Sequence, residues 1–351
     1  MAAFAEPDFP FELAGILARG SERSRACAEH YGVPLYAHPE ELPPEIEYAC
    51  VVVGAGINGG PGAELAQALM RRGIHVLQEH PLHHDELAAC LREAGRSGVG
   101  YQLNTHYVHI EPVRRFIAAA HAVFERQPPL FIDVICSIQV AYTLLDILGQ
   151  VLGRTRPSAF SAAPEPSERL RQLGTVSRPF RSVEGVLAGI PVTVRLQNQL
   201  NPRDPDNHSH LIHRITVGAE GGTLTLATTH GPILWAPRPH LPENARHVVA
   251  LDKADGEHLD MPSVTPIGPP DAPSYREILG EVWPAGVRNA LLELRASVES
   301  GEDSLKKGQY HLALCRLWQE LTTEVGYPQG LDEAVPMPLS VGELGLSQLE
   351  A

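Results

Sequence analysis

The sequence has few of the features that mark nucleic-acid-binding or membrane proteins. It holds 28 Lys and Arg residues against 42 Asp and Glu residues, and the formal net charge of -14 opposes contact with a polyphosphate, which needs clustered cations. No stretch approaches the roughly 18 consecutive apolar residues of a membrane span. The N-terminus has no basic region followed by an apolar run. We therefore expect no nucleic-acid partner, no membrane association and no secretory signal.

Disulfide and metal-binding patterns are equally scarce. The five cysteines are scattered, odd in number and without a CxxC pair. This pattern favours a reduced, cytoplasmic location over a disulfide framework or a zinc knuckle. The 17 histidines include no HExxH-type helical pair, so no metal site is predicted.

The length of 351 residues suits two domains, and an apolar content of 43% is normal for a globular protein. Strand-like and helix-like segments alternate over residues 1–103. Strands are predicted at 11–17, 48–53, 74–78 and 100–103, and helices at 21–31, 62–72 and 85–97. Alternation with short connections predicts a parallel, doubly wound sheet of the Rossmann type.

After Asn104 the pattern changes. Helices predicted at 113–126 and 142–152 flank a strand at 131–136, and antiparallel strands are predicted within 183–199 and 211–234. The proline-rich stretch 236–275 is predicted to be a long surface excursion, and helices follow at 275–298 and 304–325. The fold class is therefore α/β: a nucleotide-binding domain at 1–103, then an α+β domain at 104–351 with a large, mainly antiparallel sheet. We expect the C-terminal helices to pack back on the first domain.

A glycine-rich segment follows the strand at 48–53. Its glycines match G-x-G-x-x-G, the dinucleotide fingerprint in which backbone N–H groups approach a pyrophosphate. Two observations oppose this interpretation. A complete strand–helix pattern precedes the segment, whereas the fingerprint belongs to the first strand of such a domain. The expected acidic residue after the next strand would be Gln78 or Glu79, which a second motif includes. The candidate cofactor contacts here are Gly54 and Ala55.

A second interpretation places the pyrophosphate loop upstream of Met1, so that 11–17 is the second strand of the sheet. The end of that strand selects the cofactor. An acidic residue there would bind a ribose 2′-hydroxyl, whereas serines and arginines suit a 2′-phosphate, which guanidinium binds bidentately. Another explanation is an ordinary helix N-cap with solvated arginines, and the sequence leaves both open. The residues at this strand end are Gly20, Ser21, Arg23 and Ser24.

The tripeptide Glu79-His80-Pro81 ends the strand predicted at 74–78. Ligands of doubly wound sheets bind outside the carboxyl ends of the strands, and histidine can donate a proton near neutral pH. The tripeptide is therefore a candidate catalytic site. The alternative is an ordinary strand-to-helix turn in which Pro81 starts the next helix.

The whole chain resembles the glucose–fructose oxidoreductase/inositol dehydrogenase superfamily, in which a Glu-Lys-Pro motif follows this strand. Within that superfamily it is most similar to the thiazolinyl imine reductases of pyochelin- and yersiniabactin-type siderophore pathways. The run Gln78-Glu79-His80-Pro81-Leu82-His83 is specific to this branch. Further matching segments are 17–25, 32–36, 104–107, 144–149, 198–200 and 229–232.

The departures from the superfamily pattern concern the reaction. Its sugar dehydrogenases use the Lys of Glu-Lys-Pro, with an Asp and a His of a later helix, to deprotonate a hydroxyl. The corresponding residues here are His80, Gln139 and Thr143, which argues against alcohol oxidation. An imine reductase needs a hydride at the C=N carbon and a proton at the nitrogen. The resemblance implies His80 and Tyr107 as candidate proton donors.

The resemblance also implies the reaction and its partners. NADPH would reduce a thiazoline, carried as a thioester on a nonribosomal peptide synthetase carrier domain, to a thiazolidine. Glu79 and Asn104 would orient the cofactor, and the carrier arm would enter between the domains. The family's usual dimer surface is an exposed face of the C-terminal sheet, so we expect a homodimer. Competing hypotheses are a sugar or cyclitol dehydrogenase and a non-catalytic binding protein.

Members of the family begin with a strand and a Gly-Thr-x-Phe-Gly-like phosphate loop, whereas this sequence begins just after them. Loss of a central parallel strand leaves backbone groups unpaired, so we expect poor stability and weak NADPH binding of the chain as written. A start codon assigned too late is the hypothesis that explains this. It predicts an upstream, in-frame strand and glycine loop.

Overall fold

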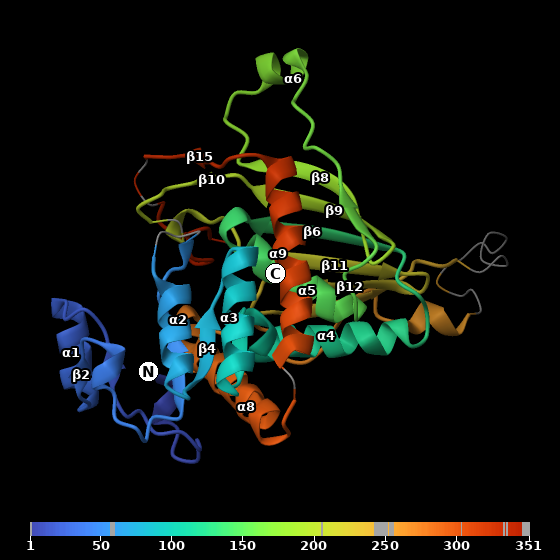
Figure 1. Ribbon diagram of the computed structural model, residues 1–351. Coiled ribbons are helices and arrows are strands. Elements are labelled where there is room, and N and C mark those ends of the chain that lie inside the picture. The colour runs from blue at the N-terminus through green and yellow to red at the C-terminus, as the bar shows by residue number, and fades with distance from the viewer. Residues whose placement is uncertain are drawn as a thin grey trace.

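The computed structural model describes residues 2–56, 60–204, 206–241, 252, 256–302, 304–332, 334 and 336–345. Figure 1 shows a parallel-stranded N-terminal part beside a larger sheet, with long helices between and across them. Among the described residues, no helix is long and apolar enough to cross a membrane.

The N-terminal part contains two separate parallel sheets. β1 (Ile16–Leu17) pairs with β2 (Leu35–Tyr36), and β3 (Tyr48–Val51), β4 (His75–Glu79) and β5 (Tyr101–Asn104) form a second sheet in the order β3-β4-β5. The connecting helices are α1 (Glu22–Tyr31), α2 (Gly62–Arg71) and α3 (His84–Ser97). This alternation of strand and helix confirms the predicted Rossmann-like class.

The division between the two sheets bears on the strand assignment. In the doubly wound order 3-2-1-4-5-6, the second and fourth strands flank the first. Strands β1 and β3 lie in different sheets, and Figure 1 shows β2 and α1 apart from β4. The separation is compatible with the interpretation of 11–17 as the second strand of that order, which stays a prediction.

The strand predicted at 11–17 is wrong in its length, since only Ile16 and Leu17 form β1. The reason is aromatic packing ahead of it. Phe11 contacts Phe9 and Tyr48, with ring centroids 5.1 and 5.0 Å apart, so this stretch covers β3 and α8 (Trp283–Glu299) instead of extending the sheet.

The larger sheet has eight strands in the order β14-β13-β12-β11-β6-β9-β8-β7, and all neighbours are antiparallel except β6 and β9. This confirms the large, mainly antiparallel sheet. Its β8–β9 turn places Ala188 and Gly189 at φ 56 and 87, the left-handed pair that suits a tight hairpin. The strands are β6 (Phe131–Ser137), β7 (Ser158–Phe160), β8 (Phe180–Leu187), β9 (Ile190–Gln197), β11 (His213–Ala219), β12 (Gly222–Leu226), β13 (Ile233–Pro237) and β14 (Thr265–Pro266).

Four long helices join the two parts. α4 (Glu111–Phe124) and α5 (Ala141–Leu152) pack on the large sheet, while α8 packs on β4 and β5. α9 (Ser304–Val325) lies between α3 and α5, as Figure 1 shows. The chain therefore returns to the N-terminal part and fixes the carboxyl ends of its strands against α5.

Some of the shorter elements were not predicted from the sequence. β10 (Gln199–Leu200) pairs in parallel with β15 (Gln329–Gly330), and α6 (Glu168–Leu173) is a short helix. α7 (Tyr275–Glu277) begins the helix predicted at 275–298, which continues through a π-helical stretch, Ile278–Val282, into α8. Two-residue strands carry no periodicity that a sequence could display. Much of the predicted excursion at 236–275 lies outside the described residues, namely 242–251 and 253–255.

Candidate active site

The carboxyl ends of β3, β4 and β5 lie along one edge of the parallel sheet. Glu79 is paired with Asn104 across β4 and β5, and Gly54 and Ala55 follow β3 at the same edge. Doubly wound sheets bind their ligands at this edge. The structure thus brings these four predicted cofactor-binding residues together with His80.

His80 is held in a defined protonation state. Its Nδ1 lies 2.9 Å from the carbonyl oxygen of Asn104, and its ring stacks on Tyr142 with centroids 5.7 Å apart. A carbonyl only accepts, so Nδ1 carries the hydrogen and the neutral ring keeps a lone pair on Nε2. Burial lowers the pKa of His80, although the Asn104 carbonyl and Asp146 act in the other direction. The neutral imidazole is therefore the resting form.

Tyr107 follows β5 through a strained turn. His106 has φ 63 and ψ -62, and the Tyr107 N–H donates to the Thr105 carbonyl at 2.7 Å, which closes a γ-turn. That conformation is rare for a residue with a side chain. The His106 N–H donates to Oδ1 of Asn104 at 2.9 Å. Burial raises the pKa of Tyr107 to about 12, so the hydroxyl keeps its proton at neutral pH.

His213 on β11 packs edge-on to Tyr107, with ring centroids 5.1 Å apart. The Thr143 hydroxyl donates to the Val140 carbonyl at 2.8 Å, so its oxygen accepts from Nε2–H of His213 at 3.0 Å. Oγ1 of Thr229 accepts the His213 backbone N–H at 3.0 Å and donates to Nδ1 at 3.1 Å. Both ring nitrogens are thus occupied, and burial lowers the pKa of His213 to about 3. His213 is therefore a neutral ring, bonded at both nitrogens, that packs against Tyr107 and does not act as an acid.

A second pair of imidazoles flanks Trp283. The indole N–H donates to Nε2 of His230 at 3.1 Å, and the His106 ring lies edge-on to the indole at 5.7 Å. Burial lowers the pKa of both His106 and His230 to about 4. Nε2 of His106 is buried without a hydrogen-bond partner among the described residues. Tyr107 therefore lies between the neutral rings of His106 and His213, and Trp283 and His230 continue the cluster beyond His106.

Sequence reasoning did not single out His213 or Trp283. His213 begins a strand of the large sheet and Trp283 begins a helix near the C-terminal end, so only the tertiary fold brings His213 to Tyr107 and Trp283 to His106. For His230 the sequence did offer a signal, because the segment 229–232 is one of those that carry the family resemblance.

Gln139 and Thr143 are the residues that the resemblance places at the positions of a sugar-oxidising Asp and His. Nε2 of Gln139 donates to the Ser209 hydroxyl at 2.6 Å, and Thr143 is fully buried in its bonds to Val140 and His213. Neither side chain can act as a base.

The residues after β1 form a helix cap. Oγ of Ser21 accepts the Ser24 N–H at 3.2 Å, the Ser24 hydroxyl donates to the Ser21 carbonyl, and Arg25 donates to the Gly20 carbonyl. The structure thus contains the predicted N-cap. The Ser21 and Arg23 residues are exposed at the same strand end, so a hydroxyl and a guanidinium fit the chemistry of a 2′-phosphate there.

The glycine loop after β3 folds back on itself. The Gly62 N–H donates to the Gly54 carbonyl at 3.0 Å, and a Cβ on Gly60 would lie 2.1 Å from that same oxygen. The Gly56 N–H donates to the Glu86 carboxylate at 2.9 Å, so it is not available to a pyrophosphate. The third glycine of the motif, Gly59, lies outside the described residues.

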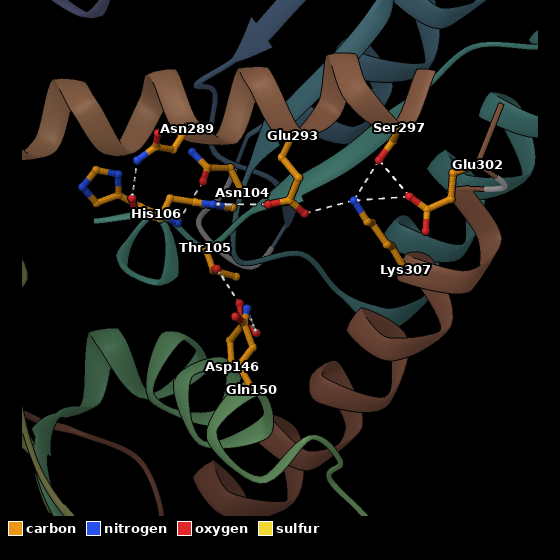
Figure 2. A network of polar contacts seen from close by, with 11 residues as sticks. Asn104, Thr105, His106, Asp146, Gln150, Asn289, Glu293, Ser297, Glu302 and Lys307 are labelled. Carbon is orange, nitrogen blue, oxygen red and sulfur yellow. Dashed lines mark hydrogen bonds and ion pairs between the residues drawn. The ribbon is translucent and has the colours of Figure 1, made fainter. Parts of the chain in front are cut away.

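A cavity of about 860 Å³ lies between α4, α5, α8 and α9, and its lining does not include His80 or Tyr107. A polar network crosses this region from Asn104 to Glu302 (Figure 2). Within the described part of the chain, no group of three or more His, Cys, Asp or Glu side chains is arranged to hold a metal ion. The residues that line the cavity include Gln102, Thr105, Asp146, Glu293, Lys307 and Tyr310.

Comparison with known families defines the class. Residues 1–105 match the oxidoreductase family with an NAD-binding Rossmann fold. This match and the fold define an NAD(P)-dependent oxidoreductase. Residues 127–236 match the family described as thiazolinyl imine reductase Irp3-like, C-terminal. Together the two matches support the glucose–fructose oxidoreductase/inositol dehydrogenase superfamily, with a second part that is similar to thiazolinyl imine reductases.

Solved structures share the fold along nearly the whole chain. KijD10, a 3-ketoreductase from Actinomadura kijaniata in complex with NADP and TDP-benzene, is 14% identical with a TM-score of 0.63, and 94% of each chain is covered. A putative myo-inositol dehydrogenase from Sinorhizobium meliloti is 15% identical with a TM-score of 0.58, covering 91% of this chain and 90% of that one. At these identities the likeness concerns the fold alone. No curated protein matches the sequence significantly.

Proposed function

We propose that the protein is an NADPH-dependent thiazolinyl imine reductase of siderophore biosynthesis. Its substrate would be a thiazoline held as a thioester on a nonribosomal peptide synthetase carrier domain, and its product a thiazolidine. The match of residues 127–236 supports this substrate class. The observation that carries the proposal is the protonated Tyr107 at the strand edge, where the positions of a sugar-oxidising Asp and His hold the hydrogen-bonded Gln139 and Thr143.

The reaction needs one hydride and one proton. Bound NADPH supplies the hydride to the C=N carbon, and the nitrogen then takes a proton from the protein. Tyr107 is the donor that the geometry favours, because its hydroxyl is protonated at neutral pH. A neutral His80 has no proton on Nε2, and its imidazolium is disfavoured by burial. His80 would therefore act as a hydrogen-bond acceptor that orients the substrate.

The cofactor would lie along the carboxyl edge of the strands. Glu79, Asn104, Gly54 and Ala55 would contact its nicotinamide and ribose end, while Ser21 and Arg23 would bind the 2′-phosphate. The exposed hydroxyl and guanidinium at the start of α1 are the observation that supports NADPH over NADH.

The partners remain proposals that rest on the same assignment. The carrier domain would deliver its substrate between the two parts of the chain, and an exposed face of the eight-stranded sheet would form a homodimer in the cytoplasm. Light scattering of the purified protein measures the dimer directly.

Reduction of a thiazoline thioester, followed by NADPH absorbance, tests the function. Tyr107→Phe should lower kcat by about 100-fold or more, since a positioned acid contributes about that factor, and should change NADPH affinity little. The matched control is Tyr275→Phe, because Tyr275 is 78% exposed and lies far along the chain from β5. Full activity in both Tyr107→Phe and His80→Asn would refute the assignment, and so would turnover of a cyclitol with NADP⁺ in place of the thiazoline.

A further inference from the structure

Asp146 is a buried carboxylate that bonds to the turn before Tyr107. It lies on α5 and is 1% exposed. Its Oδ2 accepts from the Thr105 hydroxyl at 2.5 Å, and its Oδ1 accepts from the Tyr310 hydroxyl at 2.8 Å and from Nε2 of Gln150 at 3.2 Å. Figure 2 shows Thr105 and Asp146 pointing toward one another across the gap between β5 and α5.

The side chains that donate hydrogen bonds to this carboxyl group are all neutral. No Arg or Lys of the described residues forms an ion pair with Asp146, although Lys307 is paired with Glu293 nearby. A buried polar group without a cationic partner depends on its hydrogen bonds, and losing one leaves an unsatisfied buried atom. The short bond from Thr105 therefore fixes the orientation of that side chain.

Thr105 is also the first residue of the strained turn. Its carbonyl accepts the Tyr107 N–H at 2.7 Å, while His106 between them holds positive φ. Such a conformation costs on the order of 1–3 kcal/mol and persists only where the surroundings fix it. The side chain of Thr105 is hydrogen-bonded to Asp146 on α5, and its backbone forms the turn. The placement of Tyr107 therefore depends on the placement of Asp146.

We propose that Asp146 is a positioning residue: through Thr105 it holds the turn at His106 that directs Tyr107 into the active site. The catalytic part of this proposal rests on the proposed function, in which Tyr107 donates the proton. The structural part, that the bond holds the turn, stands independently.

The two oxygens of Asp146 provide a matched pair of variants. Thr105→Val removes the bond to Oδ2 and keeps the shape of the side chain, whereas Tyr310→Phe removes a bond to Oδ1 of the same carboxylate without touching the turn. Each variant leaves Asp146 beside the cavity, which has room for a water that replaces the lost donor. Both are therefore expected to fold with similar losses of stability.

The activity measurement separates positioning from stability. Thr105→Val should lower kcat about tenfold with a KM for NADPH within about twofold of the parent, since misplacing a reacting group acts on the chemical step. Tyr310→Phe should keep kcat within about twofold, and Thr105→Ser should restore the parent rate because it restores the hydroxyl. Equal kcat for Thr105→Val and Tyr310→Phe would overturn the proposal.

Hydrogen exchange of the segment 104–110 is the second readout. Thr105→Val should speed exchange of the Tyr107 amide about tenfold or more, and Tyr310→Phe should leave it unchanged. If Thr105→Val does not fold, Asp146→Asn carries the same measurement, with faster exchange expected. Unchanged exchange refutes the structural part. Full activity of both Tyr107→Phe and His80→Asn refutes the proposed function instead, so the two failures are distinguishable.

Discussion

Acid should destabilise the protein through its buried histidines, and His213 allows the effect to be calculated. His213 is fully buried, and burial lowers its pKa from 6.5 to about 3. The unfolded chain binds a proton near pH 6.5 and the folded chain does not, so stability rises with pH between these values. The contribution is fully present above pH 6.5 and is lost as pH falls toward 3. At pH 5 the loss is about 2 kcal/mol, because one pKa unit corresponds to about 1.4 kcal/mol.

His213→Gln removes this titration. The variant should be less stable at pH 7.5, because some bonds to Thr143 and Thr229 are lost, at about 1–3 kcal/mol for an unsatisfied buried group. Between pH 7.5 and 5, however, the free energy of unfolding of the variant should fall by about 2 kcal/mol less than that of the parent. Urea unfolding followed by tryptophan fluorescence and circular dichroism measures the difference.

The control is His30→Gln, an exposed histidine on α1, which should follow the parent at both pH values. Equal losses in the parent and in His213→Gln between pH 7.5 and 5 would refute the reasoning. They would mean that the folded protein accommodates the proton between Thr143 and Thr229.

Two further predictions concern the reaction and the cofactor. If Tyr107 donates the proton, kcat should stay level from pH 6.5 to about 10 and fall as the pH approaches the Tyr107 pKa of about 12. If the His80 imidazolium is the donor, kcat should instead fall tenfold for each pH unit above 6.5. A pH–rate profile distinguishes the two. Arg23→Glu should raise the NADPH dissociation constant about 10- to 100-fold in fluorescence titrations, since it replaces a charge-assisted phosphate contact, and should change NADH binding less than twofold. The exposed Arg96→Glu is the control, and an equal effect on both cofactors would exclude a 2′-phosphate contact.

Local signals explain why much of the fold could be predicted from the sequence. α1 begins at the Ser21 cap and ends at Gly32, whose φ of 63 is left-handed, and α3 ends at Gly98 in the same way. Short apolar runs such as Tyr48–Val51 became parallel strands. These elements are specified by neighbours in the sequence, so patterns of a few residues are sufficient to find them.

The features that could not be predicted from the sequence depend on contacts between segments that are distant along the chain. Because of the aromatic cluster around Phe11, β1 is shorter than predicted, and no periodicity in the sequence indicates such packing. In the candidate site, the family resemblance implied His80 and Tyr107 as proton donors, and the position of His80 at a strand end was the signal from the residues themselves. His213 reaches Tyr107 from the large sheet, and Trp283 reaches His106 from α8, so only the assembled fold reveals them.

The direction of the reaction follows from the site as a whole rather than from His80. A neutral imidazole with a free Nε2 can accept a proton, so His80 by itself is compatible with alcohol oxidation. The resemblance implies that a sugar dehydrogenase of this superfamily also uses an Asp and a His at the positions of Gln139 and Thr143. Gln139 cannot ionise, and the Thr143 hydroxyl is bonded to Val140 and His213. With those groups absent and Tyr107 protonated, the site is suited to give one proton, which is what reduction of a C=N bond requires after hydride transfer.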